Sequence, residues 1–537
     1  MANSFTSTSQ YDEQIPVLIV GGSLVGLSTA LFLSWHGIKC LLVERHRGLS
    51  PFIRAGGLSP RTMELYRQSE LEATIREAAS PTDAQVLQVE SLVGKELAAM
   101  NISDFVTPAS PMASCAITQN MLEPILQARA RQLGADLRFN TRLISFQPET
   151  DKVTALIEDQ ASGKRSTISA RYLIAADGGN SPIRESLGIT TQGPGVLSHQ
   201  ANILFSADLS GPLRGRKVLF CHVTNADIQG ILGNDPFNAR SVLVVSYHPE
   251  SGEREEEFAG ERGIRLIRAA VGVPDLALDI LETRSWEMAA FVAERFGEGR
   301  VFLVGDSAHV MPPMGGFGAN TGIADAHNLA WKLAFVLKGL AGPQLLDTYA
   351  AERRPVVQLT VGQALANFAE RFSERQTGDT AAPRLDYYTV VLGYLYHSAA
   401  VLEGTASSEQ YEDPQQPTGR PGSRAPHVML ERAGKPISTL DLFKRNFVLL
   451  CAEAGDAWSD AGKLVAKQLG IALDIYRIGE KGELIEGEQR FQQAYGISST
   501  GAVLIRPDGF IGWRQRGTAE HPKQVLFSAL SQLLSRE

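Results

Sequence analysis

The amino-terminal part of the chain alternates between apolar runs and a glycine-rich turn. Residues 17–20 are apolar and mostly β-branched, the turn 21–23 follows at once, and residues 24–35 are again mainly apolar. A further apolar run, 39–43, ends in Glu44. Continuous β-branched runs are typical of buried parallel strands, whereas the longer apolar segment suits a packed helix. The pattern therefore predicts a strand, a tight turn, a helix and a second strand.

This turn carries the features of a dinucleotide site. Gly21 permits the sharp turn, Gly26 lets the helix pack closely on the strand, and the helix start offers free N–H groups to phosphate. Glu44 follows roughly 20 residues later, where an acid accepts hydrogen bonds from ribose hydroxyls. Ser23 stands in place of the middle glycine of G-x-G-x-x-G, and it is small enough for close approach. An ordinary βαβ unit with a glycine turn is the alternative.

Two later apolar runs also end in glycine and an acid. Residues 172–176 lead to Asp177, and residues 300–304 lead to Gly305 and Asp306. Open α/β sheets bind their ligands at the carboxyl ends of strands, so both acids are candidate ligand contacts. The second run is followed by a glycine-rich loop and a long apolar helix pattern. A nucleotide-type strand this late in the chain predicts that the first domain is discontinuous.

The remaining segments have different patterns. Short alternating stretches separated by turn residues predict an antiparallel sheet inserted on the substrate side. The last segment follows a βαβ-ββα order that resembles a thioredoxin-like domain, although it has no C-x-x-C motif for redox chemistry. We therefore expect an α/β fold with an α+β insert, with a nucleotide-binding domain over 1–188 and 291–402, a substrate-binding antiparallel domain over 189–290, a linker over 403–425 and a structural or dimer-forming domain over 426–537.

Composition narrows the class of protein. A net charge of −8 over 537 residues argues against a general nucleic-acid surface. No apolar run reaches the ~18 residues of a membrane span, and residues 1–14 carry no apolar core of a secretory signal. The four cysteines are scattered without metal-ligand spacing. We expect a cytoplasmic protein, without a metal site, that binds neither membrane nor nucleic acid.

The three motifs in this order resemble the group A FAD-dependent aromatic monooxygenases, of the p-hydroxybenzoate and phenol hydroxylase type. The likeness is greatest to polyketide hydroxylases, and matching stretches include 61–65, 122–126 and 330–333. The resemblance covers essentially the whole chain. It implies a Rossmann-type FAD domain, an antiparallel-sheet substrate domain and a thioredoxin-like C-terminal domain.

The resemblance also implies a set of cofactor contacts. The glycine turn would hold the FAD pyrophosphate, Glu44 the adenosine ribose, and Asp306 the ribityl chain, while Asp177 belongs to a motif that contacts both FAD and NADPH. Arg54 could instead be a solvated loop charge. The full expected set is Gly21, Gly22, Ser23, Leu24, Val25, Gly26, Glu44, Arg45, Arg54, Gln119, Leu143, Asp177, Gly305, Asp306, Pro313, Gly315, Gly318, Ala319 and Asn320.

The implied reaction has two halves. NADPH would reduce FAD, and O2 would then add to the flavin to give a C4a-hydroperoxide that hydroxylates a phenolic or polycyclic aromatic substrate. Because the cofactor supplies the hard chemistry, we expect no strong catalytic side-chain signature. Candidate substrate-wall residues are Phe220, Tyr247 and Trp286, and Arg371 is the catalytic candidate, with a surface salt bridge as its alternative. We expect a monomer or homodimer.

Other classes of function share parts of this pattern. A flavin-dependent dehydrogenase or oxidase would keep the FAD motifs without incorporating oxygen. A non-catalytic flavoprotein would keep the glycine turn without substrate-stimulated NADPH oxidation. A drug-inactivating hydroxylase would be chemically the same enzyme with another substrate. A halogenase is disfavoured, because the sequence has no lysine-bearing insert of that family's type.

Overall fold

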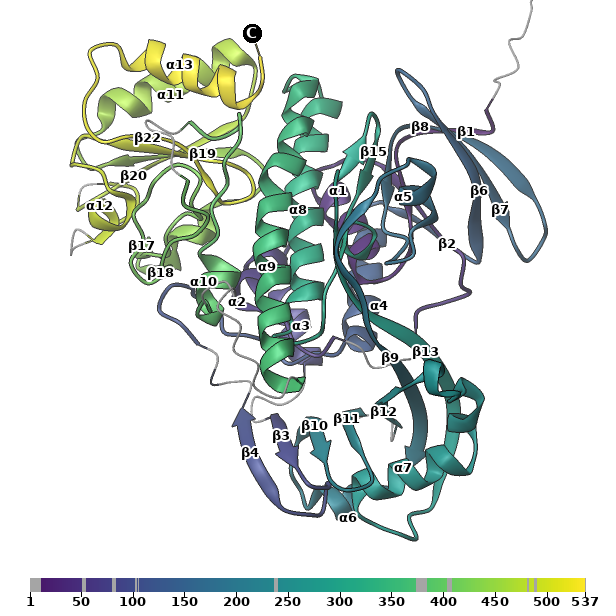
Figure 1. Cartoon of the computed structure of the whole chain (residues 1–537). Coiled ribbons are helices and arrows are strands. Elements are labelled where there is room, and N and C mark those ends of the chain that lie inside the picture. The colour runs from purple at the N-terminus through teal and green to yellow at the C-terminus, as the bar shows by residue number, and fades with distance from the viewer. Residues whose placement is uncertain are drawn as a thin grey trace, which may run out of the picture.

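Three sheets of four or more strands organise the described part of the chain, and β17 and β18 form a further two-stranded sheet (Figure 1). The structure is a computed structural model, and it describes residues 11–50, 55–79, 84–101, 104, 106–235, 240–372, 384–402, 408–480, 482–486 and 490–536. The first sheet and its helices hold the amino-terminal strands, the second sheet lies below them in Figure 1, and the C-terminal unit packs at the side. The predicted α/β class with an antiparallel insert is confirmed.

The first sheet has a parallel centre in the order β15-β8-β1-β2-β5. The short strand β14 pairs antiparallel with β15, and β7 and β6 extend from β8 as an antiparallel pair. Apolar residues fill the centre, where helix α1 packs on β1 and β2 and strand β6 also contacts β2. The strands are β1 (Glu13–Val20), β2 (Cys40–Glu44), β5 (Asp136–Phe139), β6 (Thr141–Pro148), β7 (Val153–Asp159), β8 (Arg165–Ala175), β14 (Gly297–Glu298) and β15 (Val301–Leu303).

Helix α1 packs between the first sheet and two further helices, α4 and α8. Ser28, Phe32 and their neighbours on α1 are buried on nearly every side, which explains why this helix is apolar all round. Helices α8 and α9 run side by side through the middle of the molecule (Figure 1). The helices of this part are α1 (Leu24–Trp35), α2 (Pro60–Gln68), α3 (Glu72–Ala78), α4 (Gln119–Gln132), α5 (Pro182–Ser186), α8 (Phe317–Leu337), α9 (Thr348–Phe372) and α10 (Tyr387–Leu392).

The second sheet has the order β16-β13-β9-β12-β11-β10-β3-β4. Its neighbours are antiparallel except for β10 and β3, which are parallel. Strands β3 and β4 come from residues 85–101, a stretch in which the sequence pattern had not identified strands. Helix α7 (Glu261–Val271) covers one face, and α6 (Ser210–Leu213) lies nearby. The strands are β3 (Gln85–Val89), β4 (Glu96–Asn101), β9 (Thr191–Ala207), β10 (Val218–Thr224), β11 (Gln229–Asp235), β12 (Arg240–Tyr247), β13 (Leu278–Ala293) and β16 (His309–Val310).

The C-terminal unit has a four-stranded sheet in the order β20-β19-β21-β22. Helices α11 and α13 pack against each other beside this sheet, and a Pro-Asp-Gly turn joins its last two strands. Cys451 lies buried in β19, where burial raises the pKa of its thiol to about 12. The elements are β17 (Met429–Arg432), β18 (Lys435–Ser438), β19 (Phe447–Ala452), α11 (Asp456–Leu469), β20 (Leu473–Ile478), α12 (Arg490–Tyr495), β21 (Ala502–Ile505), β22 (Ile511–Gln515) and α13 (Pro522–Leu533).

A buried ionic cluster joins this unit to α8 and α9. Glu352 accepts hydrogen bonds from Lys332 Nζ at 2.7 Å and from Arg506 Nη1 and Nη2 at 2.6 and 2.8 Å. Arg506 also donates to Asp508, in the turn between β21 and β22, at 2.5 Å. All four side chains are buried, and their formal charges cancel. The Glu352–Arg506 ion pair crosses between α9 and the C-terminal unit, so separating the two would break a buried ion pair, and the cluster ties them together.

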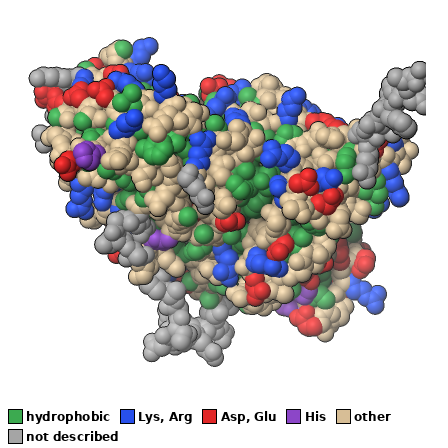
Figure 2. All heavy atoms as spheres, turned by 90° about the horizontal axis from the view of Figure 1, so that it is seen from above, with side chains coloured by type: hydrophobic (Ala, Val, Ile, Leu, Met, Phe, Trp, Pro, Cys, Tyr) green, Lys and Arg blue, Asp and Glu red, His purple; other side chains and the backbone are tan. Residues whose placement is uncertain are grey.

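The surface carries charges of both signs. Figure 2 shows Lys and Arg side chains interspersed with Asp and Glu on the face seen from above. Within the described residues, no helix combines the length and apolar character needed to cross a membrane.

Candidate active site

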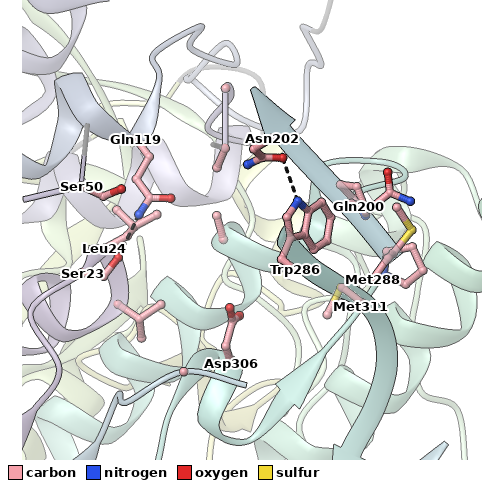
Figure 3. A pocket seen from close by; sticks show the side chains of 18 of the residues that line it. Ser23, Leu24, Ser50, Gln119, Gln200, Asn202, Trp286, Met288, Asp306 and Met311 are labelled. Carbon is pink, nitrogen blue, oxygen red and sulfur yellow. Dashed lines mark hydrogen bonds between the residues drawn. The ribbon is translucent and has the colours of Figure 1, made fainter. Parts of the chain in front are cut away.

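A cavity of ≈ 2370 Å³ lies between the carboxyl edge of the first sheet and the floor of the second (Figure 3). Pockets for one small molecule have volumes of about 300–1,000 Å³, so this space can hold two ligands side by side. Most of the expected cofactor residues line it. They are Gly21, Gly22, Ser23, Leu24, Val25, Glu44, Arg45, Gln119, Leu143, Asp177, Asp306, Pro313, Gly315, Gly318, Ala319 and Asn320.

The glycines of the first turn are required by the space around them. A Cβ atom at Gly21 would lie 2.1 Å from the carbonyl oxygen of Ala176, and the φ of Gly21 is +111°. At Gly22 it would lie 2.7 Å from Glu44 Cβ, and at Gly26 it would lie 1.9 Å from the Gly21 carbonyl oxygen. Gly26 therefore stays behind the cavity wall and allows α1 to start close to β1, as expected.

Ser23 directs its side chain away from the helix start. It does not cap α1; its Oγ donates to Glu123 Oε1 at 2.8 Å and accepts from Gln119 Nε2 at 2.9 Å (Figure 3). The backbone N–H groups of the first turn of α1 are thereby left to a ligand, and they carry the positive end of the helix dipole. This is an arrangement that fits a pyrophosphate.

Glu44 closes the same corner at the end of β2. Its Oε2 accepts from the Gly22 N–H at 2.6 Å, and its Oε1 accepts from the His46 N–H at 2.8 Å. The carboxylate is thus held at the cavity wall by backbone donors on either side. An acid in this position can accept hydrogen bonds from a ribose.

Asp177 follows β8 and is mostly buried. Burial raises the pKa of its carboxyl group, against hydrogen bonds from Ser181 and the Ile183 N–H. Its Oδ1 is buried and meets no hydrogen-bond partner within the described part of the chain. Since the residue lines the cavity, this oxygen is placed to accept a hydrogen bond from a bound cofactor.

The third strand end supplies the opposite wall. Asp306 follows β15 and points into the cavity (Figure 3), while Gly305 packs against Val25 behind the lining. Asn320, at the start of α8, accepts from the Ser59 N–H at 2.9 Å and donates to the Gly316 carbonyl at 2.7 Å. Asn320 thus ties the glycine loop before α8 to the segment before α2, which sets the shape of this wall.

Behind this wall lies a buried charged group. His309 Nε2 is 2.6 Å from Asp325 Oδ2, and Arg353 Nε donates to Asp325 Oδ1 at 2.8 Å. Burial alone would raise the pKa of Asp325, but the charges of His309 and Arg353 hold it below its ordinary value. The group fixes the loop after β15 to α8 and α9, and it lies outside the cavity lining.

Two of the three expected substrate residues face the cavity, and the third faces the opposite side of its strand. Phe220 and Trp286 line the cavity, whereas Tyr247 does not. Alternate residues of β12 face opposite sides, so Val244 and Ser246 line the cavity while Tyr247 packs against Phe258 in the core beneath α7. The structure therefore corrects the expectation that Tyr247 forms part of the substrate wall.

Two other expected residues cannot be placed in the site. Arg54 lies outside the described residues. Arg371 is in the last turn of α9, and its side chain is outside the described part of the structure. Its role as a catalytic residue stays a prediction.

Sequence reasoning missed the polar floor contributed by β9. Ser198, Gln200 and Asn202 alternate along this strand and line the cavity beside Trp286 and Met288 of β13 (Figure 3). The residues 198–202 are Ser-His-Gln-Ala-Asn, so His199 obscures the alternation, and the sequence alone does not show that Ser198, Gln200 and Asn202 face a cavity rather than solvent.

The comparisons with known proteins identify the family. Residues 14–364 match the family model described as FAD binding domain, and residues 418–536 match the model described as aromatic-ring hydroxylase, C-terminal. The chain belongs to the FAD-dependent aromatic-ring hydroxylases. The resemblance inferred from the three motifs is thereby confirmed, and FAD is the cofactor of this hydroxylase.

The hydroxylase is similar to full-length relatives with different named substrates. It is 43% identical to a 4-methyl-5-nitrocatechol 5-monooxygenase of Burkholderia sp, over 98% of both chains. It is 39% identical to an aklavinone 12-hydroxylase of Streptomyces purpurascens, over 98% of this chain and 100% of the other. The crystal structure of aklavinone-11 hydroxylase with FAD and aklavinone matches with a TM-score of 0.92 and 39% identity, over 98% of this chain and 100% of that one.

Proposed function

We propose that this hydroxylase uses NAD(P)H and O2 to hydroxylate a phenolic, polycyclic aromatic substrate. One observation carries the proposal: a single cavity joins the dinucleotide turn to the apolar floor of the second sheet. Its volume of ≈ 2370 Å³ exceeds what FAD and a single-ring substrate require, if each occupies a pocket of ordinary size. A relative's named substrate, aklavinone, supports the same size class.

The residues of the first sheet fit FAD. The glycine turn leaves space that a Cβ would fill, the start of α1 offers N–H groups, and Asp177 holds an unpartnered buried oxygen. When bound, FAD would supply the hydride acceptor and the means of activating oxygen. Asp306 and the loop 312–320 would hold its ribityl and ring portions, a role that stays a proposal.

The floor of the second sheet would hold the substrate. Its lining near β10 and β12 is largely apolar, with Leu219, Phe220, Val242 and Val244. Such a lining favours aromatic rings and displaces water, which protects a reactive oxygen-transfer step from hydrolysis and leakage. Positioning and exclusion of water are thus the contributions that we assign to this part of the chain.

NAD(P)H would bind only transiently. The sequence contains one glycine turn of the dinucleotide type, so FAD and the reductant cannot each have a dedicated Rossmann site. We assign Asp177 to the region that both would approach, since it lies at a strand end that opens into the cavity.

The test is NADPH and NADH oxidation by the purified FAD-loaded protein, with and without a panel of phenols. The panel contains 4-methyl-5-nitrocatechol, 1-naphthol and 1-hydroxyanthraquinone, and products are analysed by mass spectrometry under ¹⁸O₂. Stimulated oxidation with one ¹⁸O atom in a polycyclic product is the expected result. Oxygenation of the nitrocatechol alone would contradict the assigned size class.

Other outcomes would move the assignment to another class. Substrate oxidation without incorporation of oxygen would indicate a flavin-dependent dehydrogenase or oxidase. Hydroxylation of a finished antibiotic in preference to its precursors would indicate a drug-inactivating hydroxylase. Bound FAD with no stimulation by any aromatic compound would contradict the proposed reaction.

A further inference from the structure

The polar strip along β9 interrupts an otherwise apolar floor. Ser198, Gln200 and Asn202 face the cavity at alternate positions, whereas Ala201, between the two amides, and Ile203, after Asn202, point into the core. Burying amide groups is costly unless their hydrogen-bonding capacity is used. The inference drawn from this strip concerns the same cavity, and it rests on the proposed function.

Gln200 is held in one orientation by two serines. Its side chain is 5% exposed, and its Nε2 donates to Ser198 Oγ at 3.0 Å and to Ser246 Oγ at 2.9 Å. Both N–H bonds of the amide are therefore used. No donor in the described part of the chain contacts its Oε1, so this oxygen remains available as a fixed acceptor.

Asn202 is held in the complementary orientation. Its Oδ1 accepts from Trp286 Nε1 at 2.8 Å, as the dashed line in Figure 3 shows. The Nδ2 group carries two N–H donors, and none of the described acceptors engages them. The same hydrogen bond holds the indole ring of Trp286, whose exposed fraction is 36%.

The two amides are neighbours of Trp286 on the adjacent strand β9. Gln200 is directly opposite Trp286 in the β9–β13 register, and Asn202 is its diagonal neighbour. Residues two apart on a strand are separated by about 7 Å. A fixed acceptor and a fixed donor therefore project from β9 at backbone positions about 7 Å apart, beside one aromatic side chain.

The strip can be placed relative to the glycine loop through strand β13. Phe291 of β13 pairs with Val310 of β16, which directly precedes the glycine loop assigned to the flavin ring. Trp286 is five positions from Phe291 (291 − 286), a contour of roughly 17 Å along the strand.

We propose that Gln200 and Asn202 are the substrate-recognition pair of this enzyme. Gln200 Oε1 accepts a hydrogen bond from a phenolic hydroxyl, and Asn202 Nδ2 donates one to a carbonyl oxygen of the same fused ring system. Trp286 packs against that ring. The ligand class is a neutral polycyclic aromatic compound with both hydroxyl and carbonyl substituents, such as a hydroxyquinone.

The charges nearby favour a neutral ligand. Arg284, which lies opposite Asn202 in the register and lines the cavity, has its Nε 2.6 Å from Glu282 Oε1. The carboxylate offsets its charge, so the strip presents amide and hydroxyl groups rather than a cation for a phenolate or nitrocatecholate.

The experiment measures binding to the full-length, FAD-loaded protein without NADPH. The probes are 2-hydroxyanthraquinone, whose hydroxyl is too far from a ring carbonyl to bond to it internally, and anthraquinone, and binding is followed by perturbation of the flavin absorption spectrum. We expect the wild-type protein to bind the hydroxylated probe about tenfold more tightly, as one net hydrogen bond implies. Gln200→Leu should lose this preference and leave anthraquinone binding unchanged, whereas Asn202→Leu should weaken both probes about tenfold.

Two further variants separate recognition from folding. Gln200→Glu keeps an acceptor and should keep the preference, so it tests the role even where leucine impairs FAD uptake. Gln88→Leu is the matched control, because it removes an amide from the cavity wall on β3, which is separated from β9 by three strands of the same sheet. It should retain the preference for the hydroxylated probe.

Several results would overturn the proposal. The first is that Gln200→Leu keeps the preference for the hydroxylated probe. The second is that Gln88→Leu loses this preference as fully as Gln200→Leu does. The third is that the wild-type protein binds neither anthraquinone. The last result would leave the proposed function standing if the same preparation hydroxylated another polycyclic phenol. Failure of the proposed function would instead be seen if the wild-type protein bound the probes but, when supplied with NADPH or NADH and O2, oxygenated none of the phenols in the panel.

Discussion

Glu352→Gln should destabilise the folded chain by about 3–5 kcal/mol, the usual cost of removing one partner from a buried ion pair. In the native cluster the charges of Glu352 and Asp508 balance those of Lys332 and Arg506. The glutamine would leave a net buried positive charge. Its amide NH2 group would also face donors that now bind Glu352 Oε2, among them Lys332 Nζ at 2.7 Å and Asn328 Nδ2 at 2.8 Å.

The pH dependence of this loss follows from Lys332. Burial lowers its pKa to about 8, and Glu352 is the main group that opposes the decrease. Without Glu352 the pKa of Lys332 falls further, so the variant loses that proton at a pH where the wild-type lysine keeps it. Between the two pKa values the stability of the variant rises relative to the wild type by about 1.4 kcal/mol per pH unit. The destabilisation should therefore be larger at pH 6 than at pH 9.

The assay is urea unfolding followed by tryptophan fluorescence and circular dichroism at pH 6 and pH 9. Glu298→Gln is the matched control, because Glu298 and its partner Arg295 are each 51% exposed and such surface pairs contribute less than about 1 kcal/mol. FAD content should be unchanged in both variants, since neither residue lines the cavity. A loss in Glu352→Gln no greater than the control, or one that does not shrink as the pH rises, would refute the reasoning.

Three further predictions concern the cofactor turn, acid stability and strand parity. Gly26→Ala places a Cβ 1.9 Å from the Gly21 carbonyl and should yield protein without FAD, as measured by absorbance at flavin wavelengths, whereas Gly362→Ala, with open space around it, should retain FAD. Burial lowers the pKa of His327 to about 3, so below pH 6.5 the unfolded chain binds a proton that the folded chain does not, and the free energy of unfolding falls. His327→Gln should reduce the loss of this free energy between pH 6.5 and pH 5 by about 2 kcal/mol, as measured by urea unfolding. An unchanged loss would contradict this. Tyr247→Phe should leave binding of 2-hydroxyanthraquinone unchanged in the same titration, because its ring packs beneath the sheet; weakened binding would place Tyr247 in the site after all.

The cofactor side was predictable because its signals are local in sequence. The turn 21–26 needs glycine for reasons that involve a strand, a turn and the next helix, and such motifs carry their geometry with them. The ends of β8 and β15 were identifiable by the same logic, since an acid after a buried strand lies at the carboxyl edge. The expected residues Asp177 and Asp306 accordingly meet at one cavity.

The substrate side was less predictable, because which face a strand residue occupies depends on what packs against the sheet. A shift of one position separates Ser246 in the cavity from Tyr247 in the core. Strands β3 and β4 join the second sheet from residues 85–101, far from it in sequence, and no local pattern indicates that pairing.

The sequence by itself determined the class of this protein: its family, its α/β architecture and the turn that suits FAD follow from short motifs whose physics is contained within a few tens of residues. The tertiary structure decided which polar groups meet. The Gln200 and Asn202 amides acquire their orientation from Ser246 and Trp286, which lie on other strands, and Glu352 acquires its partners from α8 and the C-terminal unit. Hydrogen bonds and ion pairs act over a few ångströms in space, so chain segments distant in sequence define them only once the sheets are assembled.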